Sequence, residues 1–498
     1  MKLSKLRSYL SDVKSYDYND RNIIGIVHDS RRVNQGYLFV AIKGHSVDGH
    51  NFVMDAIERG AVAIVTEKKL DLPPGAPQLV VSDTRKALSV LSHHFYGEPS
   101  SKITITGITG TNGKTTTSYL IKSIIESAGA QAGLIGTILY QINQRLIPSI
   151  ETTPESVELH AFLAEMLAFD IKYAVMEVSS HALVQHRTSD INFRTAVFTN
   201  LSHEHLDYHR TVTAYRDAKA RLFEGLSKKS FAILNADEPN SKHFASRTQA
   251  QIIWYGMKNK PACALHADRA EVTAEVIFRT INNTEFRLCC PKGEAIISSQ
   301  LIGDHNVYNA LAAAANALAL GFDLETIKKG IEAVSSVRGR LETIECGQKF
   351  RVFIDFAHTP DALQTVLTTL RPLTKGRIIL VFGCGGNRDR EKRPKMGRIA
   401  ETYSDLFWIT SDNPRSEDPI SIINEVESGI TSGSYYRIQP DRRLAIEEAL
   451  SEAKKNDTVL IAGKGHERCQ IFNGTVIPFD DRDVVKKILL QRPVFYFF

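Results

Sequence analysis

Residues 103–129 read ITITGITGTNGKTTTSYLIKSIIESAG, and this stretch decides the fold. Its first seven residues are rich in β-branched side chains, which predicts a short buried strand. After a glycine turn, Leu120, Ile121, Ile124 and Ile125 recur at helical spacing, and the glycine that closes the stretch is a typical helix stop. A strand, a glycine-rich turn and a helix in this order indicate an α/β fold.

The glycine turn of this stretch has the features of a phosphate-binding loop. Gly110 and Gly113 leave backbone amides free for phosphate oxygens, Lys114 can reach the β- and γ-phosphates, and the Thr115 hydroxyl can ligate Mg²⁺. Ile108 departs from the strict G-x-x-x-x-G-K-[ST] pattern, which has glycine there. The alternative is therefore a glycine turn with a surface lysine. The strand before the turn and the helix after it favour nucleotide binding.

Further apolar runs alternate with helical segments along the chain. Those that read as strands are GYLFVAI (36–42), AVAIVTE (61–67), PQLVVSD (77–83), YAVMEV (173–178), TAVFTN (195–200), FAILNAD (231–237), RVFIDFA (351–357), RIILVFG (377–383), DLFWIT (405–410) and DTVLIAG (457–463). This alternation indicates parallel sheets with helices on both faces. Polar residues follow several of these runs, at the edge where open α/β sheets bind their ligands.

A chain of 498 residues predicts about three domains. We place a first domain at residues 1–100, a central nucleotide-binding domain at 101–338 and a C-terminal Rossmann-like domain at 339–498. The segment GEPSSK (97–102) is typical of a linker, and VRGR (337–340) follows a helical segment.

The composition excludes several classes of protein. Hydrophobic residues make up 43% and charged residues 23%, which rules out disordered, collagen-like and disulfide-knot chains. The net charge of +5 is spread along the chain, so no nucleic-acid partner is expected. The six cysteines form no C-x-x-C pair, which favours a reducing, cytoplasmic compartment. No signal peptide or long apolar run occurs, so no membrane insertion is expected. The tail RPVFYFF (492–498) is expected to pack back onto a domain.

The ends of the YAVMEV and TAVFTN runs carry acidic and histidine residues. Glu177 and His205 are the metal candidates. A zinc site made of His203, His205 and His209 is one alternative, and a polar loop whose side chains cap the backbone is another. Beside a nucleotide loop the expected ion is Mg²⁺, which prefers oxygen ligands.

These residues resemble motifs of the Mur ligase family, the ATP-dependent amide ligases that build the peptidoglycan precursor. The motifs are TGTNGKT (109–115), MEVSSH (176–181), NLSHEHLDYH (200–209), YRDAKARLF (215–223), GDHNVYNALAA (303–313), GRLE (339–342), DFAHTPDAL (355–363), GCGGNRDREKRP (383–394), DNPR (412–415) and AGKGHE (462–467). The resemblance covers nearly the whole chain. It implies three domains, which bind a uridine nucleotide, ATP and an amino acid.

The resemblance also implies a two-step reaction. The γ-carboxylate of D-glutamate in UDP-N-acetylmuramoyl-L-alanyl-D-glutamate attacks the γ-phosphate of ATP, which gives an acyl phosphate and ADP. The amine of an amino acid then attacks the acyl carbon, and the last three motifs imply that this amino acid is meso-2,6-diaminopimelate. Because two anions must meet in the first step, Lys114 and Mg²⁺ must neutralise charge. The expected form is a monomer that binds these small molecules.

Roles at the nucleotide follow from the same resemblance. The implied ATP contacts are Gly110, Thr111, Asn112, Gly113, Lys114, Thr115, Thr116, Asn306, Arg340, Asp355 and His358. The implied catalytic residues are Lys114, Glu177, His205 and Lys219, and the implied Mg²⁺ ligands are Thr115, Glu177, His205 and Lys219. Lys219 matches a lysine that carbon dioxide converts to N6-carboxylysine, and this carbamate turns a cation into an oxygen ligand. Taken alone, Lys219 reads as a solvated helix lysine.

Roles at the other two substrates are implied in the same way. The implied contacts to the UDP-muramoyl-dipeptide are Ser30, His45, Ser46, Val47, Thr152, Thr153, Ser179, Gln185 and Arg187. Those to diaminopimelate are Arg388, Asp412, Asn413, Pro414, Arg415, Gly463 and Glu467. Arg415 can grip the distal carboxylate with two parallel hydrogen bonds. Glu151 departs from the family, because relatives often have asparagine there.

Three alternatives stay open. A folylpolyglutamate synthetase shares the phosphate loop and the lysine, but would not be expected to carry DNPR or HDSR (28–31). A Mur ligase that adds lysine differs chiefly in its amino-acid pocket. Separately, Arg415 could make only a surface salt bridge. A non-enzymatic nucleotide switch would bind ATP without making an amide bond.

Overall fold

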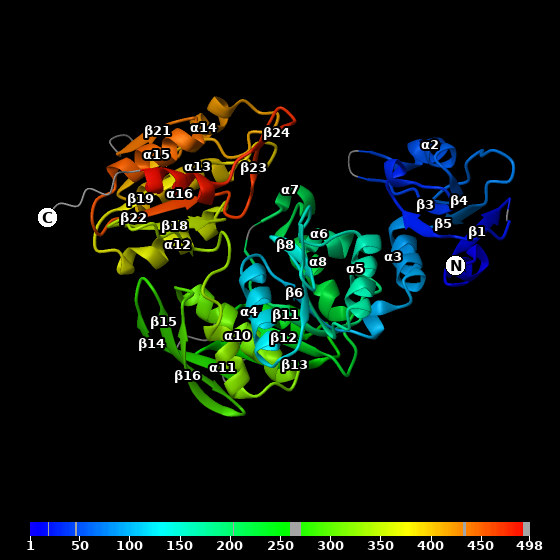
Figure 1. Cartoon of the computed structure of the whole chain (residues 1–498), viewed down its shortest axis with the longest axis horizontal. Coiled ribbons are helices and arrows are strands. Elements are labelled where there is room, and N and C mark those ends of the chain that lie inside the picture. Colours follow the sequence, from blue (N-terminus) through cyan, green and yellow to red (C-terminus); the bar gives the residue numbers. More distant parts are fainter. Residues whose placement is uncertain (18, 45–46, 203, 259–269, 432–434, 492–498) are drawn as a thin grey trace.

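The computed structural model describes residues 1–17, 19–44, 47–202, 204–258, 270–431 and 435–491. These residues form three lobes, each built on its own main sheet. Figure 1 shows the central lobe between the N-terminal and C-terminal lobes. The expected tail contact of residues 492–498 lies outside the described residues.

The N-terminal lobe contains a five-stranded sheet of order β1-β5-β4-β3-β2. Its strands are β1 (Val13–Tyr16), β2 (Gly25–Val27), β3 (Tyr37–Val40), β4 (Ala61–Thr66) and β5 (Gln78–Val81). Its helices are α1 (Leu3–Ser8), η1 (Ser30–Arg32), η2 (Gly49–Phe52), α2 (Val53–Glu58) and α3 (Thr84–Phe95), followed by η3 (Pro99–Ser101). All strand pairs are parallel except β1 with β5.

The central lobe contains an eleven-stranded sheet of order β16-β15-β14-β13-β12-β11-β6-β10-β7-β8-β9. Its strands are β6 (Thr104–Thr109), β7 (Ala132–Ile135), β8 (Leu139–Ile142), β9 (Arg145–Pro148), β10 (Tyr173–Glu177), β11 (Phe193–Phe198), β12 (Phe231–Asn235), β13 (Gln251–Met257), β14 (Val272–Arg279), β15 (Thr284–Cys290) and β16 (Gly293–Ser299). Its helices are α4 (Lys114–Ser127), α5 (Ser156–Ala168), α6 (Ser180–Val184), α7 (Leu206–His209), α8 (Val212–Glu224), α9 (Ser241–Ala245), α10 (Asp304–Ala319) and α11 (Leu324–Glu332). The strands from β14 to β7 are parallel, and antiparallel hairpins extend the sheet at both edges.

The C-terminal lobe contains a six-stranded sheet of order β17-β18-β22-β19-β20-β21. Its strands are β17 (Glu342–Thr343), β18 (Arg351–Asp355), β19 (Ile378–Phe382), β20 (Leu406–Ile409), β21 (Tyr436–Ile438) and β22 (Thr458–Ala462), and β23 (Cys469–Phe472) and β24 (Thr475–Pro478) form a separate hairpin. Its helices are α12 (Pro360–Leu370), η5 (Arg371–Leu373), α13 (Lys392–Tyr403), α14 (Pro419–Glu427), α15 (Arg442–Glu452) and α16 (Asp481–Gln491). Only β17 pairs antiparallel in the main sheet.

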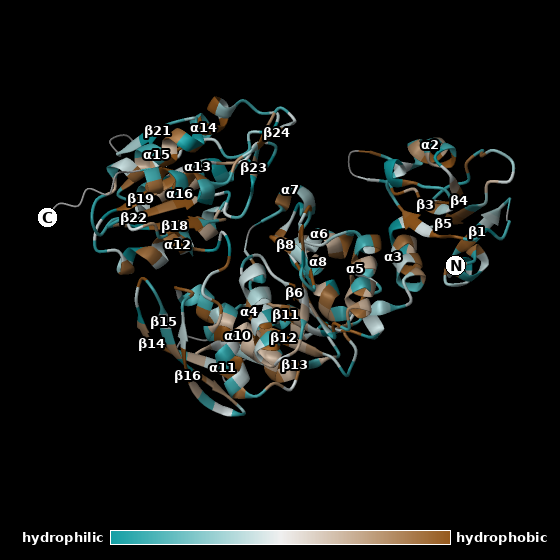
Figure 2. Ribbon diagram, viewed as in Figure 1, coloured by the Kyte–Doolittle hydropathy of each residue, from teal (hydrophilic) through white to brown (hydrophobic). Residues whose placement is uncertain are grey.

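Each of the ten further apolar runs noted in the sequence contains or overlaps a strand of these sheets, so the α/β prediction is confirmed. The antiparallel hairpins at the edges of the central sheet were not predicted from the sequence. Figure 2 shows apolar strands inside each lobe and polar residues on the outer helices. Within the described residues, no helix combines the length and apolar character that crossing a membrane requires.

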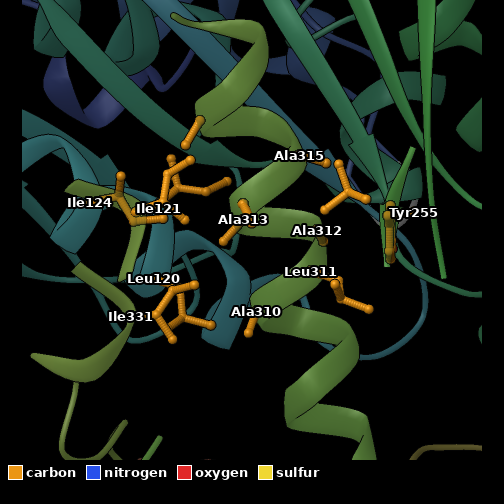
Figure 3. Close-up of a cluster of buried hydrophobic side chains, with 14 of the residues drawn as sticks. Leu120, Ile121, Ile124, Tyr255, Ala310, Leu311, Ala312, Ala313, Ala315 and Ile331 are labelled. Carbon is orange, nitrogen blue, oxygen red and sulfur yellow. The ribbon is translucent and has the colours of Figure 1, made fainter. Parts of the chain in front are cut away.

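Helix α4 is fixed against α10 by apolar packing (Figure 3). Leu120, Ile121 and Ile124 of α4 are buried in one cluster with the alanines of α10 and with Ile331 of α11. Small alanine side chains let the two helices approach closely, and burying each large apolar side chain contributes about 1.5–3 kcal/mol. This packing holds the N-terminus of α4 in place at the edge of the sheet.

Candidate active site

The loop between β6 and α4 requires glycine at two positions. Gly110 has φ +147°, and a Cβ there would lie 1.9 Å from Oγ1 of Thr199. Gly113 has φ +89°, and a Cβ there would lie 2.4 Å from Oδ1 of Asn309. Other residues rarely adopt such backbone conformations. Both glycines are therefore needed for backbone conformation and for space.

Lys114 begins α4 and turns back over this loop. Its Nζ donates hydrogen bonds to the backbone oxygens of Gly110 and Thr111, each at 2.8 Å. The side chain is partly buried, and this burial lowers the pKa of Lys114. The alternative of a glycine turn with a surface lysine is wrong, because the ammonium lies within the loop.

Thr115 and Glu177 meet at the ends of α4 and β10. Oγ1 of Thr115 donates to Oε2 of Glu177 at 3.0 Å. Glu177 is fully buried and also accepts from the backbone N of Thr137 at 2.9 Å and from its Oγ1 at 2.8 Å. A hydroxyl and a carboxylate are oxygen donors of the kind that Mg²⁺ prefers, so these residues fit that ion. Thr137 was missed in the sequence, although it follows β7 at the same sheet edge.

Lys219 is buried on α8, with only 1% of its surface exposed. Its Nζ donates to the backbone oxygen of Gly110 at 2.8 Å and lies 4.4 Å from the centre of the Tyr215 ring. Burial, together with the nearby charge of Lys114, lowers the pKa of Lys219 well below its ordinary value. The reading of Lys219 as a solvated helix lysine is therefore wrong.

His205 and Glu204 lie at the start of α7. Nε2 of His205 is 3.8 Å from Oε2 of Glu204, and its ring centre is 4.8 Å from that of His181. Oε1 of Glu204 is 3.5 Å from Nε2 of His358 in the C-terminal lobe. Although burial opposes its charge, the hydrogen bond from His358 and the nearby His205 and Lys114 hold the pKa of Glu204 below its usual range. Glu204 was not predicted from the sequence, because a loop carboxylate carries no periodic signal.

The zinc alternative finds no support in the described residues. His203 lies outside them, and Nε2 of His209 is 2.9 Å from Oγ of Ser180. Within the part of the chain that the structure describes, no three His, Cys, Asp or Glu side chains are grouped to hold a metal.

Arg340 connects the phosphate loop to the C-terminal lobe. Its Nη2 donates to Oγ1 of Thr115 at 3.1 Å, and its guanidinium lies 4.9 Å from the centre of the Phe356 ring. Asp355, at the end of β18, accepts from the backbone N of Leu341 at 2.7 Å, and burial raises the pKa of Asp355. These contacts fix the chain that passes between the two lobes beside the phosphate loop.

Asn306, Asn112 and Thr116 occupy different positions around the loop. Asn306 is buried on α10 and accepts from Nδ2 of Asn309, the residue that borders Gly113. Thr116 is buried in the first turn of α4, whereas Asn112 is exposed. Asn306 therefore reaches the loop through its neighbour.

Thr152, Thr153 and Ser179 lie beside Glu177. Oγ1 of Thr152 is 3.2 Å from Oγ1 of Thr137, which also donates to Glu177. Oγ1 of Thr153 donates to the backbone oxygen of Glu177 at 2.9 Å and accepts from the backbone N of Ser179 at 3.0 Å. These three residues thus border the phosphate edge of the central sheet.

Arg187 and Gln185 extend this group, whereas the N-terminal residues lie in another lobe. Nη2 of Arg187 donates to Oε1 of Gln185 at 2.7 Å, and Nη1 donates to the backbone oxygen of Thr153 at 2.8 Å. Ser30 is in η1 and Val47 is exposed, both in the N-terminal lobe. Two more predicted contacts, His45 and Ser46, lie outside the described residues.

Asn413 and Glu467 are joined by a lysine that the sequence analysis missed. Nδ2 of Asn413 donates to Oε2 of Glu467 at 2.8 Å. Nζ of Lys464, fully buried, donates to the same Oε2 at 2.8 Å and to Oδ1 of Asn413 at 3.1 Å. A lysine between two glycines in AGKGHE, where a strand ends, is the signal that could have found it.

Arg415 points into the same corner of the C-terminal lobe. Its backbone is left-handed with φ +56°, and Nη1 donates to the backbone oxygen of Gly386 at 2.7 Å. Burial and the nearby Arg388 lower the pKa of Arg415. Among the described residues, no carboxylate pairs with Arg415 within 4.0 Å. The alternative of a surface salt bridge is therefore not what the structure has.

Gly463 and Asp412 complete this corner. Gly463 follows β22 with φ +111°, and a Cβ there would lie 2.9 Å from Oδ2 of Asp412. Asp412, Asn413 and Pro414 are all buried in the segment after β20. The loops after β20 and β22 therefore meet at the carboxyl edge of the sheet, as the sequence analysis expected.

Three family descriptions match successive parts of the chain. The Mur ligase family catalytic domain matches residues 22–96, the Mur ligase middle domain matches 108–317, and the Mur ligase glutamate ligase domain matches 339–465.

Similar proteins share nearly the whole length of the chain. The UDP-N-acetylmuramoyl-L-alanyl-D-glutamate–2,6-diaminopimelate ligase of Bacillus licheniformis is 45% identical over 498 residues, which cover 99% of this chain and 100% of the relative. The ligase of the same name from Aquifex aeolicus is 45% identical over 469 residues, 94% of each chain. A solved structure of a ligase of that name is 33% identical, with a TM-score of 0.66 over 94% of each chain. The chain belongs to the Mur ligase family.

Proposed function

We propose that the chain is an ATP-dependent ligase that joins meso-2,6-diaminopimelate to the D-glutamate γ-carboxylate of UDP-N-acetylmuramoyl-L-alanyl-D-glutamate. Relatives of that name align along almost the entire chain. The observation that carries the choice of amino acid is Arg415, whose half-buried guanidinium has no carboxylate partner among the described residues. Diaminopimelate differs from lysine by a distal carboxylate, which a guanidinium can bind with two hydrogen bonds.

In the first step, the substrate carboxylate attacks the γ-phosphate of ATP. Lys114 would leave the loop carbonyls that it now contacts and neutralise the phosphate oxygens. Thr115 and Glu177 would hold Mg²⁺, with His205 and a carbamylated Lys219 as further ligands. Bound there, Mg²⁺ supplies positive charge against the phosphates. Carbamylation requires a neutral amine, and the lowered pKa of Lys219 favours that form.

In the second step, the amine of diaminopimelate attacks the acyl carbon of the acyl phosphate, the amide bond forms, the amine loses a proton and inorganic phosphate leaves. Asp412, Asn413 and Glu467 would bind its distal ammonium and polar edges, with Arg388 and Arg415 at its carboxylate. Thr152, Thr153, Ser179, Gln185 and Arg187 would hold the dipeptide beside the phosphate edge, and Ser30, His45, Ser46 and Val47 the uridine nucleotide. We further propose domains at 1–100, 101–338 and 339–498, and a monomer that works in the cytoplasm.

The test is phosphate release by the purified protein with ATP, Mg²⁺ and the UDP-dipeptide, with diaminopimelate, lysine and glutamate offered separately. We expect release that depends on diaminopimelate. Release with lysine alone would support the lysine-adding alternative, release with glutamate alone would support a glutamate-adding ligase, and ATP binding without any release would support a nucleotide switch.

A further inference from the structure

The guanidinium of Arg187 is already fully used within the protein. A guanidinium has five N–H bonds, one on Nε and two on each Nη. Nη1 donates to Oε2 of Glu151 and to the backbone oxygen of Thr153, and Nη2 donates to Oε1 of Glu151 at 3.2 Å and to Gln185 at 2.7 Å. Nε donates to Oε1 of Gln185 at 3.1 Å and lies 2.9 Å from Oε1 of Glu155. A substrate carboxylate can therefore bind Arg187 only by replacing one of these acceptors.

Glu151 can leave most easily, because it is exposed, whereas Gln185 is partly buried and accepts from both Nε and Nη2. The Glu151 side chain is 45% exposed, whereas that of Glu155 is 16% exposed. Oε1 of Glu155 also lies 3.5 Å from Nη1 of a second cation, Arg85. The Thr153 acceptor is a backbone oxygen of a fully buried residue. When the Glu151 carboxylate turns outward, water can solvate it at once, so its release costs little.

The backbone of Glu151 is anchored while its side chain is free to turn. The hydroxyl of Tyr140 donates to the backbone oxygen of Glu151 at 2.5 Å and accepts from its backbone N at 3.2 Å. Release of Arg187 therefore needs rotation of one side chain and no movement of the loop. The next residue, Thr152, lies beside Thr137, which donates to Glu177, so this exchange happens next to the phosphate edge.

We propose that Glu151 is an internal competitor for the dipeptide: its carboxylate occupies Arg187 in the free enzyme and is displaced when a carboxylate of the substrate binds. This inference rests on the proposed function, in which Arg187 binds the dipeptide. The exchange keeps the guanidinium paired before and after binding, so no buried cation is left alone. It also favours ligands that bring a carboxylate, because a neutral ligand that displaced Glu151 would leave the Nη atoms of Arg187 without a carboxylate and only Glu155 beside Nε.

The cost of this exchange is a lower apparent affinity. For a ligand that binds only enzyme with Arg187 released, the apparent dissociation constant equals the intrinsic one divided by the fraction of enzyme in that state. For an ion pair of this exposure, the expected penalty is about 3- to 10-fold. Glu151→Gln keeps the shape of the side chain and removes its charge. This variant should therefore bind the dipeptide more tightly by the same factor.

The experiment measures KM for the UDP-dipeptide, and its Kd by calorimetry, in wild type, Glu151→Gln, Arg187→Ala and the double variant. The control is Glu165→Gln, which removes the charge of a carboxylate that pairs with Arg145 in the same lobe, outside the proposed dipeptide site. We expect Glu151→Gln to lower KM and Kd about 3- to 10-fold, with no matching change in kcat or in KM for ATP. Glu165→Gln should leave KM and Kd unchanged.

The double variant separates the possible outcomes. Glu151→Gln should have no effect once Arg187 is alanine, and an equal effect in that background would overturn the proposal in favour of general charge repulsion. An unchanged or raised dipeptide KM in Glu151→Gln, with a raised KM in Arg187→Ala, would overturn the proposal that Glu151 competes with the dipeptide. The proposed function would still stand. An unchanged dipeptide KM in Arg187→Ala would overturn both the competitor and the proposed role of Arg187.

Discussion

Lys219 and Lys464 are both buried lysines, but their surroundings are opposite. Lys219, at the phosphate edge of the central lobe, donates to a backbone oxygen and faces a second cation, Lys114. Lys464, in the C-terminal lobe, donates to the carboxylate of Glu467 and to Asn413. Burial of a charge is costly unless an opposite charge compensates it. The first lysine is therefore poised for chemistry on its amine, and the second is a clamp that positions its neighbours.

The largest effect is expected at Lys114, the cation that shares the Gly110 carbonyl with Lys219. Lys114→Ala should lower kcat by about 10²-fold or more, because charge stabilisation at the γ-phosphate is lost. Steady-state phosphate release measures this loss. Lys122→Ala on the same helix is the control, since Lys122 pairs with Glu126 and should behave as wild type. Near-normal turnover of folded Lys114→Ala would remove the loop from the mechanism.

Lys219→Ala should also lose most activity, but for a different reason. Here the missing group is a carbamate oxygen donor, so formate or another small carboxylate should restore part of the rate. The same addition should not rescue Lys114→Ala, which lacks a cation. Intact mass of the native protein in bicarbonate checks the modification directly: full activity with an unmodified amine would contradict this role.

Substitution of Arg415 tests whether the pocket that contains Lys464 selects the amino acid. Arg415→Ala should lower kcat/KM for diaminopimelate about 10- to 150-fold, or about 1.5–3 kcal/mol, because the bonds to a distal carboxylate are lost. Lysine, which lacks that carboxylate, should be little affected. The measurement is the ratio of kcat/KM for the two amino acids. Arg437→Ala, which removes a half-exposed pair with Glu452, should leave that ratio unchanged.

The sequence predicted the parts of the site that depend on local pattern. The phosphate loop follows from two glycines between a strand and a helix, and the lobes follow from apolar runs that become strands. Glu204 and Lys464 were missed, because their roles depend on partners 154 and 51 residues away, His358 and Asn413. The hydrogen bonds that Arg187 makes to its neighbours were likewise not predicted, because they depend on the fold that brings Glu151 close to Arg187.

The smallest expected effect is on the free energy of unfolding. Replacing Lys219 should raise it, and replacing Lys464 should lower it. The pKa of Lys219 is lowered in the folded protein, so at neutral pH the unfolded chain binds a proton more readily than the folded one. Stability of the unmodified protein should therefore rise with pH, from the lowered pKa of Lys219 up to its ordinary value of about 10.4. Lys219→Met removes this penalty and should stabilise the protein at pH 7 in the absence of bicarbonate and Mg²⁺, with a gain that shrinks as the pH approaches 10.

Lys464→Met should do the reverse and destabilise the protein by about 1–3 kcal/mol, because Glu467 and Asn413 lose a buried donor. Asn413 still donates to Glu467 in that variant, and the Glu467 side chain is 31% exposed, which keeps the loss moderate. Urea unfolding of both variants at pH 7 and at pH 9.5 measures the two effects. If both substitutions change stability with the same sign at pH 7, the two lysines do not differ in the way that their neighbours indicate.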